Sequence, residues 1–177
     1  MSVCTDDSLV RIIRIKDGKA LTLADRALID TYATGCVFLP DGRVMTACAD
    51  GLLRLLNIND TDITLVQGHT GGLSSIAIDD QGLNLVTGSS DGTLRLWSRL
   101  SFQAKTLLAG HEDVITSLGF SANGDVIATA SKDASIRLWD SATAETIQVL
   151  RGHDKFATCL AFSPNGEWLA SGTGERS

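Results

Sequence analysis

The chain has 177 residues, of which 44% are hydrophobic and 20% are charged, a balance typical of folded globular proteins and not of disordered ones. Its 15 Lys and Arg residues are outnumbered by 21 Asp and Glu residues, so the formal net charge is −6. Nucleic-acid affinity rests on clustered basic residues, and because the basic residues here are scattered we expect no nucleic acid among the partners. No run approaches the roughly 20 apolar residues of a membrane helix, so we expect no membrane partner either.

The N-terminal residues and the cysteines predict an intracellular protein, located in the cytoplasm or the nucleus. The first seven residues lack the basic region and the apolar run of a secretory signal peptide. The four cysteines form no CxxC pair and show no regular spacing; they are Cys4, Cys36, Cys48 and Cys159. Three of them lie in apolar runs, which predicts reduced core residues and neither disulfides nor a metal site.

In chain order, the sequence predicts short β-strands joined by tight turns. Residues 1–25 contain the end of one strand, a second strand over 9–15 and a third over 19–24, and residues 26–67 contain a diverged four-stranded unit. Later strands of five to eight residues are rich in Val, Ile, Leu, Thr and Ala and alternate with Gln-Gly and Asn-Gly turns. Because no segment has helical periodicity over a dozen residues, the predicted fold class is all-β.

A period of 42 residues runs through the rest of the chain. Each of the three histidines follows a glycine, in Gly68-His69, Gly110-His111 and Gly152-His153. The repeats predicted from this spacing are 68–109, 110–151 and a truncated copy over 152–177. Self-similarity of this kind indicates one supersecondary unit repeated in tandem. Strands such as VIATA are apolar or small on both faces, so we expect sheets stacked on both of their sides.

The Gly-His dipeptide, followed after about 28 residues by Leu-Trp-Ser or Leu-Trp-Asp, resembles the WD-repeat family of β-propellers. The resemblance covers essentially residues 1–177. It implies blades of four antiparallel strands, about four repeats in all, and a partial propeller.

The resemblance also implies a structural role for four recurring polar and aromatic positions. In the family, a His, a Ser or Thr, an Asp and a Trp are linked by hydrogen bonds inside each blade. The matching residues here are His69, Thr87, Asp91 and Trp97, then His111, Thr129, Asp133 and Trp139, and, in the truncated copy, His153 and Ser171. Two copies depart from this pattern. The truncated copy has Glu175 in place of the Asp. The diverged copy keeps Thr46 and Asp50 but has Leu28 and Leu56 in place of the His and the Trp. Asp7 takes the Asp position of the first segment.

Two chemical interpretations of these residues compete with the structural one. Thr129, His111 and Asp133 are the components of a nucleophile–base–orienter triad, but a catalytic site needs one geometry in one cleft and this set recurs. A zinc site built from the three histidines would need ligands about 2.0–2.1 Å from one ion, whereas residues one repeat apart lie on successive blades. We therefore expect no catalytic residues, no metal and no cofactor.

Protein partners are expected on the face formed by the loops that follow each Gly-His, because the resemblance implies binding there. The candidate partner-binding residues are Thr70, Glu112, Asp113, Asp154, Lys155 and Phe156. Phe156 stands where the sister copies have Gly72 and Val114, which suits an aromatic anchor. The alternatives are that Phe156 packs at the head of its strand and that the acidic residues are solvated loop charges.

The expected function is a non-catalytic scaffold for protein–protein interaction. One alternative is a regulatory or sensor segment of a larger signalling protein, such as an ATPase with a repeat tail, and another is a fragment without independent function. A propeller enzyme would place a unique set of acids or bases in one blade, and the sequence contains none. Three architectures stay open: part of a longer propeller, a ring completed by a second copy or a partner chain, and a self-closed four-bladed ring.

Overall fold

The described residues fold as β-strands and connecting turns, with no helix among them. The computed structural model describes residues 2–4, 10–14, 16–23, 31–58 and 63–174. None of these segments therefore forms a helix long and apolar enough to cross a membrane. The predicted positions Asp7, Leu28 and Glu175 lie outside the described residues. The all-β fold class is confirmed.

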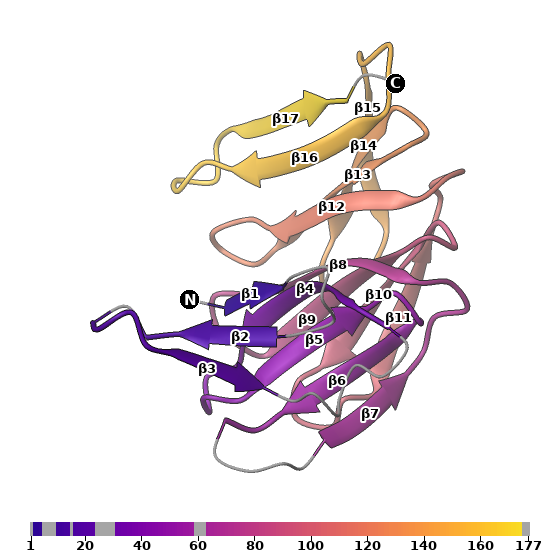
Figure 1. Ribbon diagram of the computed structural model, residues 1–177. Coiled ribbons are helices and arrows are strands. Elements are labelled where there is room, and N and C mark those ends of the chain that lie inside the picture. The colour runs from indigo at the N-terminus through magenta and orange to yellow at the C-terminus, as the bar shows by residue number, and fades with distance from the viewer. Residues whose placement is uncertain (1, 5–9, 15, 24–30, 59–62, 175–177) are drawn as a thin grey trace.

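Five antiparallel sheets follow one another along the described chain, each with its strands in sequence order (Figure 1). Sheet 1 contains β1 (Ser2–Cys4), β2 (Val10–Ile13) and β3 (Ala20–Leu23). Sheet 2 contains β4 (Ala33–Phe38), β5 (Val44–Cys48), β6 (Leu52–Leu56) and β7 (Ile63–Gln67). Sheet 3 contains β8 (Leu73–Ile78), β9 (Asn84–Ser89), β10 (Thr93–Ser98) and β11 (Ala104–Ala109).

The C-terminal part continues the same pattern. Sheet 4 contains β12 (Ile115–Phe120), β13 (Val126–Ser131), β14 (Ser135–Asp140) and β15 (Thr146–Arg151). Sheet 5 contains β16 (Ala157–Phe162) and β17 (Leu169–Thr173). Sheets 2 to 4 are thus the four-stranded antiparallel blades that the repeat predicts.

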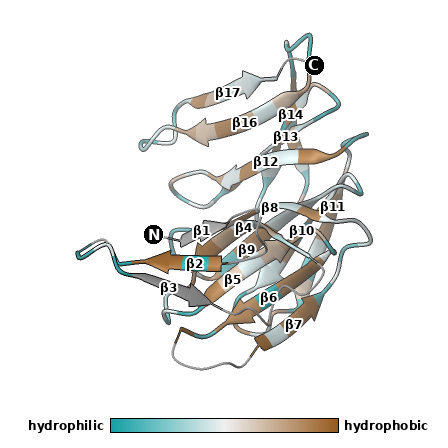
Figure 2. Ribbon diagram, in the orientation of Figure 1, coloured by the Kyte–Doolittle hydropathy of each residue, from teal (hydrophilic) through white to brown (hydrophobic). Residues whose placement is uncertain are grey.

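The sheets stack face to face, and a layer of buried apolar side chains lies between each neighbouring pair. One layer joins Val10 of sheet 1 to Val44 of sheet 2, and a second joins Met45 of sheet 2 to Trp97 of sheet 3. Two further layers link sheets 3 and 4 and sheets 4 and 5. Figure 2 shows the hydrophobic residues concentrated on the strands and the hydrophilic ones in the turns. The core is therefore divided among the sheet interfaces.

Position within the stack explains the composition of the second strand of each sheet. Strands β5, β9 and β13 are buried along almost their whole length, because a neighbouring sheet covers each of their faces. Strand β17 is their counterpart in sheet 5, and most of its residues are exposed. Only one face of sheet 5 packs against a described neighbour, through Leu160 and Leu169.

A bulge recurs in the first strand of sheets 2 to 5. The pairing with the second strand shifts between Ala33 and Gly35, and at the equivalent places in β8, β12 and β16. Beside these bulges, hydroxyls cross to the next sheet: Thr34 donates to the Leu73 carbonyl at 2.8 Å, and Thr116 donates to the Ala157 carbonyl at 2.6 Å. Bulges bend strands and increase twist, so their repetition gives successive sheets the same orientation.

The cysteine prediction is correct for Cys48, which is buried, and wrong for Cys159, which is exposed. Cys159 lies on β16, and no described sheet covers the outer face of sheet 5, so an apolar run that would be core elsewhere meets solvent here. Cys36 is half-buried. Cys48 and Cys159 are free thiols.

Candidate functional site

Sheet 4 carries a hydrogen-bonded network that crosses all of its inner strands. The Thr129 hydroxyl on β13 lies 2.7 Å from His111 Nε2 and accepts a hydrogen bond from Trp139 Nε1 at 2.9 Å. His111 Nδ1 lies 2.8 Å from the carboxylate of Asp133, in the turn before β14. The network thus ties the loop before β12 to the second and third strands of the sheet.

Burial and charge determine the protonation of this network. Burial lowers the pKa of His111 below 6.5, and Asp133 offsets this only in part. The neutral ring donates from Nδ1 to Asp133 and accepts the Thr129 hydroxyl proton at Nε2. Burial alone would raise the pKa of Asp133, but hydrogen bonds from Ser135, His111 and the backbone outweigh burial and lower it to about 2. Asp133 is therefore an anion beside a neutral histidine at pH 7.

Sheet 3 repeats the network with one looser contact. His69 Nε2 lies 2.8 Å from the Thr87 hydroxyl, which also accepts from Trp97 Nε1 at 2.9 Å. His69 Nδ1 is 3.4 Å from Asp91 Oδ2, which accepts from the amide and the hydroxyl of Thr70. The other oxygen accepts from the Thr93 hydroxyl at 2.5 Å, as Asp133 does from Ser135 at 2.6 Å. The longer His–Asp contact in sheet 3 thus accompanies an added hydrogen bond from the hydroxyl of Thr70, where sheet 4 has Glu112.

In sheet 2 the corresponding Asp has a different partner. Arg54 on β6 forms two contacts with Asp50, at 2.6 and 3.0 Å, and its side chain is only 8% exposed. The Thr46 hydroxyl donates to the Arg54 carbonyl at 3.3 Å. Asp50, the counterpart of Asp91 and Asp133, thus forms a bidentate pair with Arg54, which holds the strand position of Arg95 and Arg137 in the later sheets. In sheet 5, His153 Nε2 lies 2.8 Å from the Ser171 hydroxyl, and this contact is exposed.

The glycine that precedes each histidine leaves room for the tryptophan of the same sheet. A Cβ placed on Gly68 would overlap the Trp97 ring, and one on Gly110 would lie 2.8 Å from Arg137 Nη1 and 3.1 Å from the Trp139 ring. A Cβ on Gly152 would meet no atom within 4 Å. The Gly-His dipeptide therefore reflects packing against the third strand.

These polar residues are engaged mainly with one another. Thr129 has no exposed surface, and its hydroxyl is already engaged by Trp139 and His111. A nucleophile has to reach substrate, which Thr129 cannot do in this arrangement. In the described ranges no group of three or more His, Cys, Asp and Glu side chains could hold a metal ion. Buried polar groups that satisfy one another rigidify a sheet.

The loops after each Gly-His lie at one end of the stack, which we call the Gly-His face. Three of the candidate partner-binding residues there already hold their own loops. The Thr70 hydroxyl and amide both donate to Asp91, at 3.1 and 3.0 Å. The Glu112 amide donates to Asp133 at 3.1 Å, and the Asp113 carboxylate accepts from the Val114 amide at 2.7 Å. The side chains of Glu112 and Asp113 are exposed.

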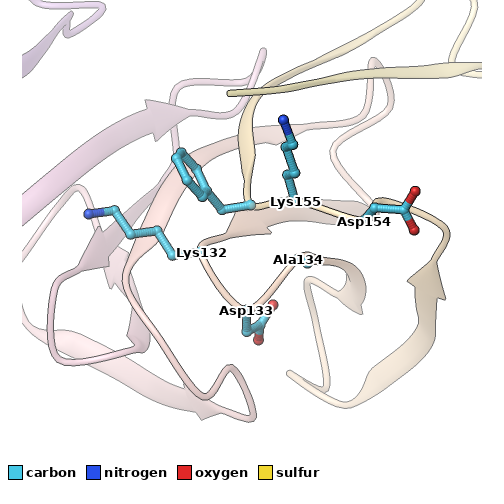
Figure 3. A pocket seen from close by; sticks show the side chains of 6 residues that line it. Lys132, Asp133, Ala134, Asp154 and Lys155 are labelled. Carbon is cyan, nitrogen blue, oxygen red and sulfur yellow. The ribbon is translucent and has the colours of Figure 1, made fainter. Parts of the chain in front are cut away.

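The other three candidates line a pocket between sheets 4 and 5. Its volume is about 440 Å³, and its lining residues are Lys132, Asp133, Ala134, Asp154, Lys155 and Phe156. Figure 3 shows Lys132 and Asp133 on one loop and Asp154 and Lys155 on a neighbouring one. The structure thus joins Asp154, Lys155 and the half-buried Phe156 to a loop of the preceding sheet, while Thr70, Glu112 and Asp113 lie outside this pocket.

Sequence reasoning missed two residues of the Gly-His face. Lys132 directly precedes Asp133 of the network and lines the pocket. Tyr32 is 49% exposed and holds the position of Phe156, because each carbonyl accepts the amide at the end of the second strand, from Ala49 at 3.0 Å and from Gly174 at 3.2 Å. An aromatic residue just before a first strand was the signal available for Tyr32.

Comparison with known proteins agrees with this architecture. The family profile described as "WD domain, G-beta repeat" matches residues 61–98, 102–140 and 144–177. The ribosome biogenesis protein ERB1 of Candida albicans is 53% identical over 38 residues, which are 22% of this chain and 4% of that protein. Transducin-like enhancer protein 2 of Mus musculus is 36% identical over 90 residues, 48% of this chain and 12% of that protein.

The matched part is thus a small share of each of these relatives, between 4% and 12% of their length. The profile, in contrast, accounts for more than half of this chain, and its three segments span sheets 3 to 5, where the His networks lie. On this match and on its stacked four-stranded sheets, the chain belongs to the WD-repeat family.

Proposed function

We propose that this chain is a non-catalytic scaffold that binds a partner protein at its Gly-His face. The pocket between sheets 4 and 5 carries the proposal, because it combines an apolar wall with charged side chains that can fix the orientation of a peptide. Phe156 would be the anchor, and Lys132 and Lys155 would lie beside it. Aromatic residues in pockets are the usual dominant contacts of protein interfaces.

Several features of the proposal draw on the family and the relatives. Proteins with WD repeats commonly bind other proteins, and the name of ERB1 states a role in ribosome biogenesis, which favours an intracellular location for this chain as well. We further propose that the repeat boundaries follow the spacing of 42 residues, with units at 26–67, 68–109 and 110–151. The partner would be a protein, with no nucleic acid, membrane or cofactor involved.

The test is affinity capture with wild-type chain and a Phe156→Ser variant, followed by calorimetry with each purified partner. We expect the substitution to weaken binding by about tenfold or more, since loss of an anchor costs about 1–2 kcal/mol or more. An Ile147→Ala variant serves as control, because Ile147 is 54% exposed on β15 and lies outside the pocket.

Two measurements separate binding from folding. Phe156→Ser has to retain the melting temperature of the wild type within a few degrees, whereas Thr129→Val, which alters the buried network, has to lower it. A partner bound equally well by wild type and Phe156→Ser would contradict the proposed site. The non-catalytic role would be contradicted if the purified chain turned over a substrate and lost this activity on Thr129→Val or Asp133→Asn at unchanged stability.

A further inference from the structure

The end of the stack opposite the Gly-His face, which we call the turn face, contains a group of side chains that breaks the internal repeat. It is formed by the turns that follow the first and third strands of each sheet. Sheets 3 and 4 have the same strands at a spacing of 42 residues, so their turns can be compared position by position. Among the pairs that differ are Leu83 and Asp125, Ser98 and Asp140, Arg99 and Ser141, Leu100 and Ala142, and Gln103 and Glu145.

The comparison shows that the fold does not require apolar side chains at these positions. Asp125 and Ala142 occupy them in sheet 4, where the backbone contact between the two turns is retained: the Ser141 amide donates to the Asp125 carbonyl at 2.9 Å. In sheet 3 the Arg99 amide donates to the Leu83 carbonyl at 3.0 Å. The two leucines therefore need an explanation other than folding.

Both leucines are exposed and held at a fixed spacing. Leu83 is 44% exposed and Leu100 is 76% exposed. The buried carboxylate of Asp79 accepts from the amides of Leu83 at 2.8 Å and Asn84 at 3.1 Å, which fixes the turn that presents Leu83. Single exposed leucines are common, but these two lie on turns joined by the Arg99–Leu83 backbone hydrogen bond, so both apolar side chains are offered at one end of sheet 3.

Guanidinium groups border this apolar surface. The Asp41 carboxylate of sheet 2 contacts Arg43 at 2.8 Å and Arg99 at 3.3 Å, so one anion is shared between two cations. Arg43 also lies over the Phe102 ring, 5.6 Å from its centroid. Each guanidinium has five N–H donors, more than one shared carboxylate can satisfy. Arg99 Nε is buried, so the donors left for an incoming anion are those of the terminal nitrogens.

The other charged groups of this region do not cancel that preference. The Asp79 carboxylate is engaged by its own turn, and Lys105 donates to the Asn84 side chain at 2.6 Å. Asp80 is exposed at the tip of the turn. In sheet 4 the corresponding end carries the acids Asp125, Asp140 and Glu145 and no Lys or Arg among the compared positions. At the compared positions sheet 3 therefore carries the leucines and an arginine, whereas sheet 4 carries the acids.

We propose that Leu83, Leu100, Arg43 and Arg99 form a second interaction surface, which binds a segment of a partner protein that presents a large apolar side chain next to a carboxylate. The apolar side chain would contact the two leucines, and the carboxylate would take the free donors of the two arginines. This surface lies at the opposite end of the stack from the pocket at Phe156, so its test is independent of the test of the proposed function.

A peptide selection tests this proposal with the full 177-residue chain. A phage library of random 12-residue peptides is selected on the wild type and counter-selected on a Leu83→Asp/Leu100→Ala variant, which carries the residues that sheet 4 tolerates. We expect the surviving peptides to carry Leu, Ile, Phe or Trp within two positions of Asp or Glu. Their affinity, measured by fluorescence anisotropy, should fall about tenfold or more on Leu100→Ala.

Arg99→Ser, the residue of sheet 4, provides a second and independent variant. It should weaken the same peptides and reduce the dependence of their affinity on salt, because it removes the charge and keeps both leucines. Ile147→Ala and Phe156→Ser are matched controls on other surfaces and should leave these affinities unchanged. All variants are compared with wild type for melting temperature.

Three results would overturn the proposal. One is that no peptide survives the counter-selection, and another is that the survivors lack carboxylates or bind Arg99→Ser as well as wild type. The third is that vesicles of phosphatidylserine bind the wild type and lose binding on Leu100→Ala while no peptide does so. That outcome would assign the surface to lipid headgroups instead of a protein.

Discussion

The buried hydroxyl of Thr129 is a hydrogen-bond partner of two other buried side chains. It accepts from Trp139 Nε1 and lies 2.7 Å from His111 Nε2, and it has no exposed surface. Thr129→Val keeps the shape of the side chain and removes the oxygen, so two buried groups lose their partner at about 1–3 kcal/mol each. We expect a loss of about 2–4 kcal/mol in the free energy of unfolding, measured by urea denaturation.

Thr106→Val is the matched control for this prediction. Thr106 lies on β11 with its side chain exposed, so the same change there removes no buried hydrogen bond. It should alter the free energy of unfolding by less than about 0.5 kcal/mol. Equal losses for the two variants would mean that the network in sheet 4 contributes nothing beyond the packing of its side chains.

The buried histidines predict how stability depends on pH. Burial lowers the pKa of His69 and His111 in the folded chain, so the unfolded chain binds protons more readily below its histidine pKa near 6.5. The contribution of the neutral histidines to the free energy of unfolding is fully present above pH 6.5. It declines as the pH falls, by up to about 1.4 kcal/mol per pH unit for each histidine. Urea unfolding at pH 7, 6 and 5 measures this slope.

Asp133 acts in the same direction at lower pH. Its pKa falls from 3.8 to about 2 on folding, so its contribution to the free energy of unfolding is present above pH 3.8 and is lost as the pH falls toward 2.

A His69→Gln/His111→Gln variant should be less stable than the wild type at pH 7, and its stability should change less between pH 7 and 5. A wild-type profile that is flat over that range would contradict the neutral, buried state of both histidines.

At the scale of the strand and its neighbouring loop, the glycines of the Gly-His dipeptides offer a graded test. A Cβ would overlap Trp97 at Gly68, would lie close to Arg137 and Trp139 at Gly110, and would meet nothing at Gly152. Overpacking a buried site costs about 1–3 kcal/mol. Substitution by Ala should therefore destabilise most at Gly68, less at Gly110 and least at Gly152, as measured by urea unfolding of the three variants.

The most specific part of this prediction is the rank order of the stability losses of the three variants. All three positions precede a histidine and none has a positive φ, so backbone strain does not distinguish them. If Gly152→Ala were as destabilising as Gly68→Ala, the glycine would serve the loop itself and not the packing of tryptophan.

The same elements show what could be predicted from the sequence. Strand positions, the turns at Gly42, Gly82, Gly124 and Gly166, and the four-stranded sheets follow from local patterns that recur every 40 to 42 residues. The pairing of Asp50 with Arg54 could not be predicted, because the same strand position is Arg95 and Arg137 in the later sheets, where the Asp contacts a His instead. The repeat pattern locates such a position in the sheet, whereas side-chain packing determines which side chain contacts it.

The candidate site divides in the same way. The spacing placed Asp154, Lys155 and Phe156 on one loop, but Lys132 joins them only through the stacking of sheet 4 on sheet 5. The turn-face surface likewise combines Arg43 of sheet 2 with Arg99 of sheet 3, which are far apart in sequence. Contacts between sheets depend on the twist and distance of whole elements, which no local pattern contains.

At the scale of the whole molecule, the outer face of sheet 5 governs how the chain behaves in solution. Ala161 and Ala170 lie opposite each other on β16 and β17 and are exposed, and Trp168 is 75% exposed beside them in sequence. In sheets 3 and 4 the second strand is covered on both faces. An uncovered sheet face and edge favour pairing with another chain.

We therefore predict that the purified 177-residue chain self-associates as its concentration rises, as measured by size-exclusion chromatography with light scattering. Ala161→Lys/Ala170→Glu should shift it toward the monomer, because charged side chains on this face would have to be desolvated on association, while their opposite charges remain compatible as a cross-strand pair. Thr106→Lys adds a charge on β11 and should leave the association unchanged. A wild-type chain that stays a monodisperse monomer and melts in one cooperative transition would contradict the prediction, because sheet 5 would then be stable with its outer face in water.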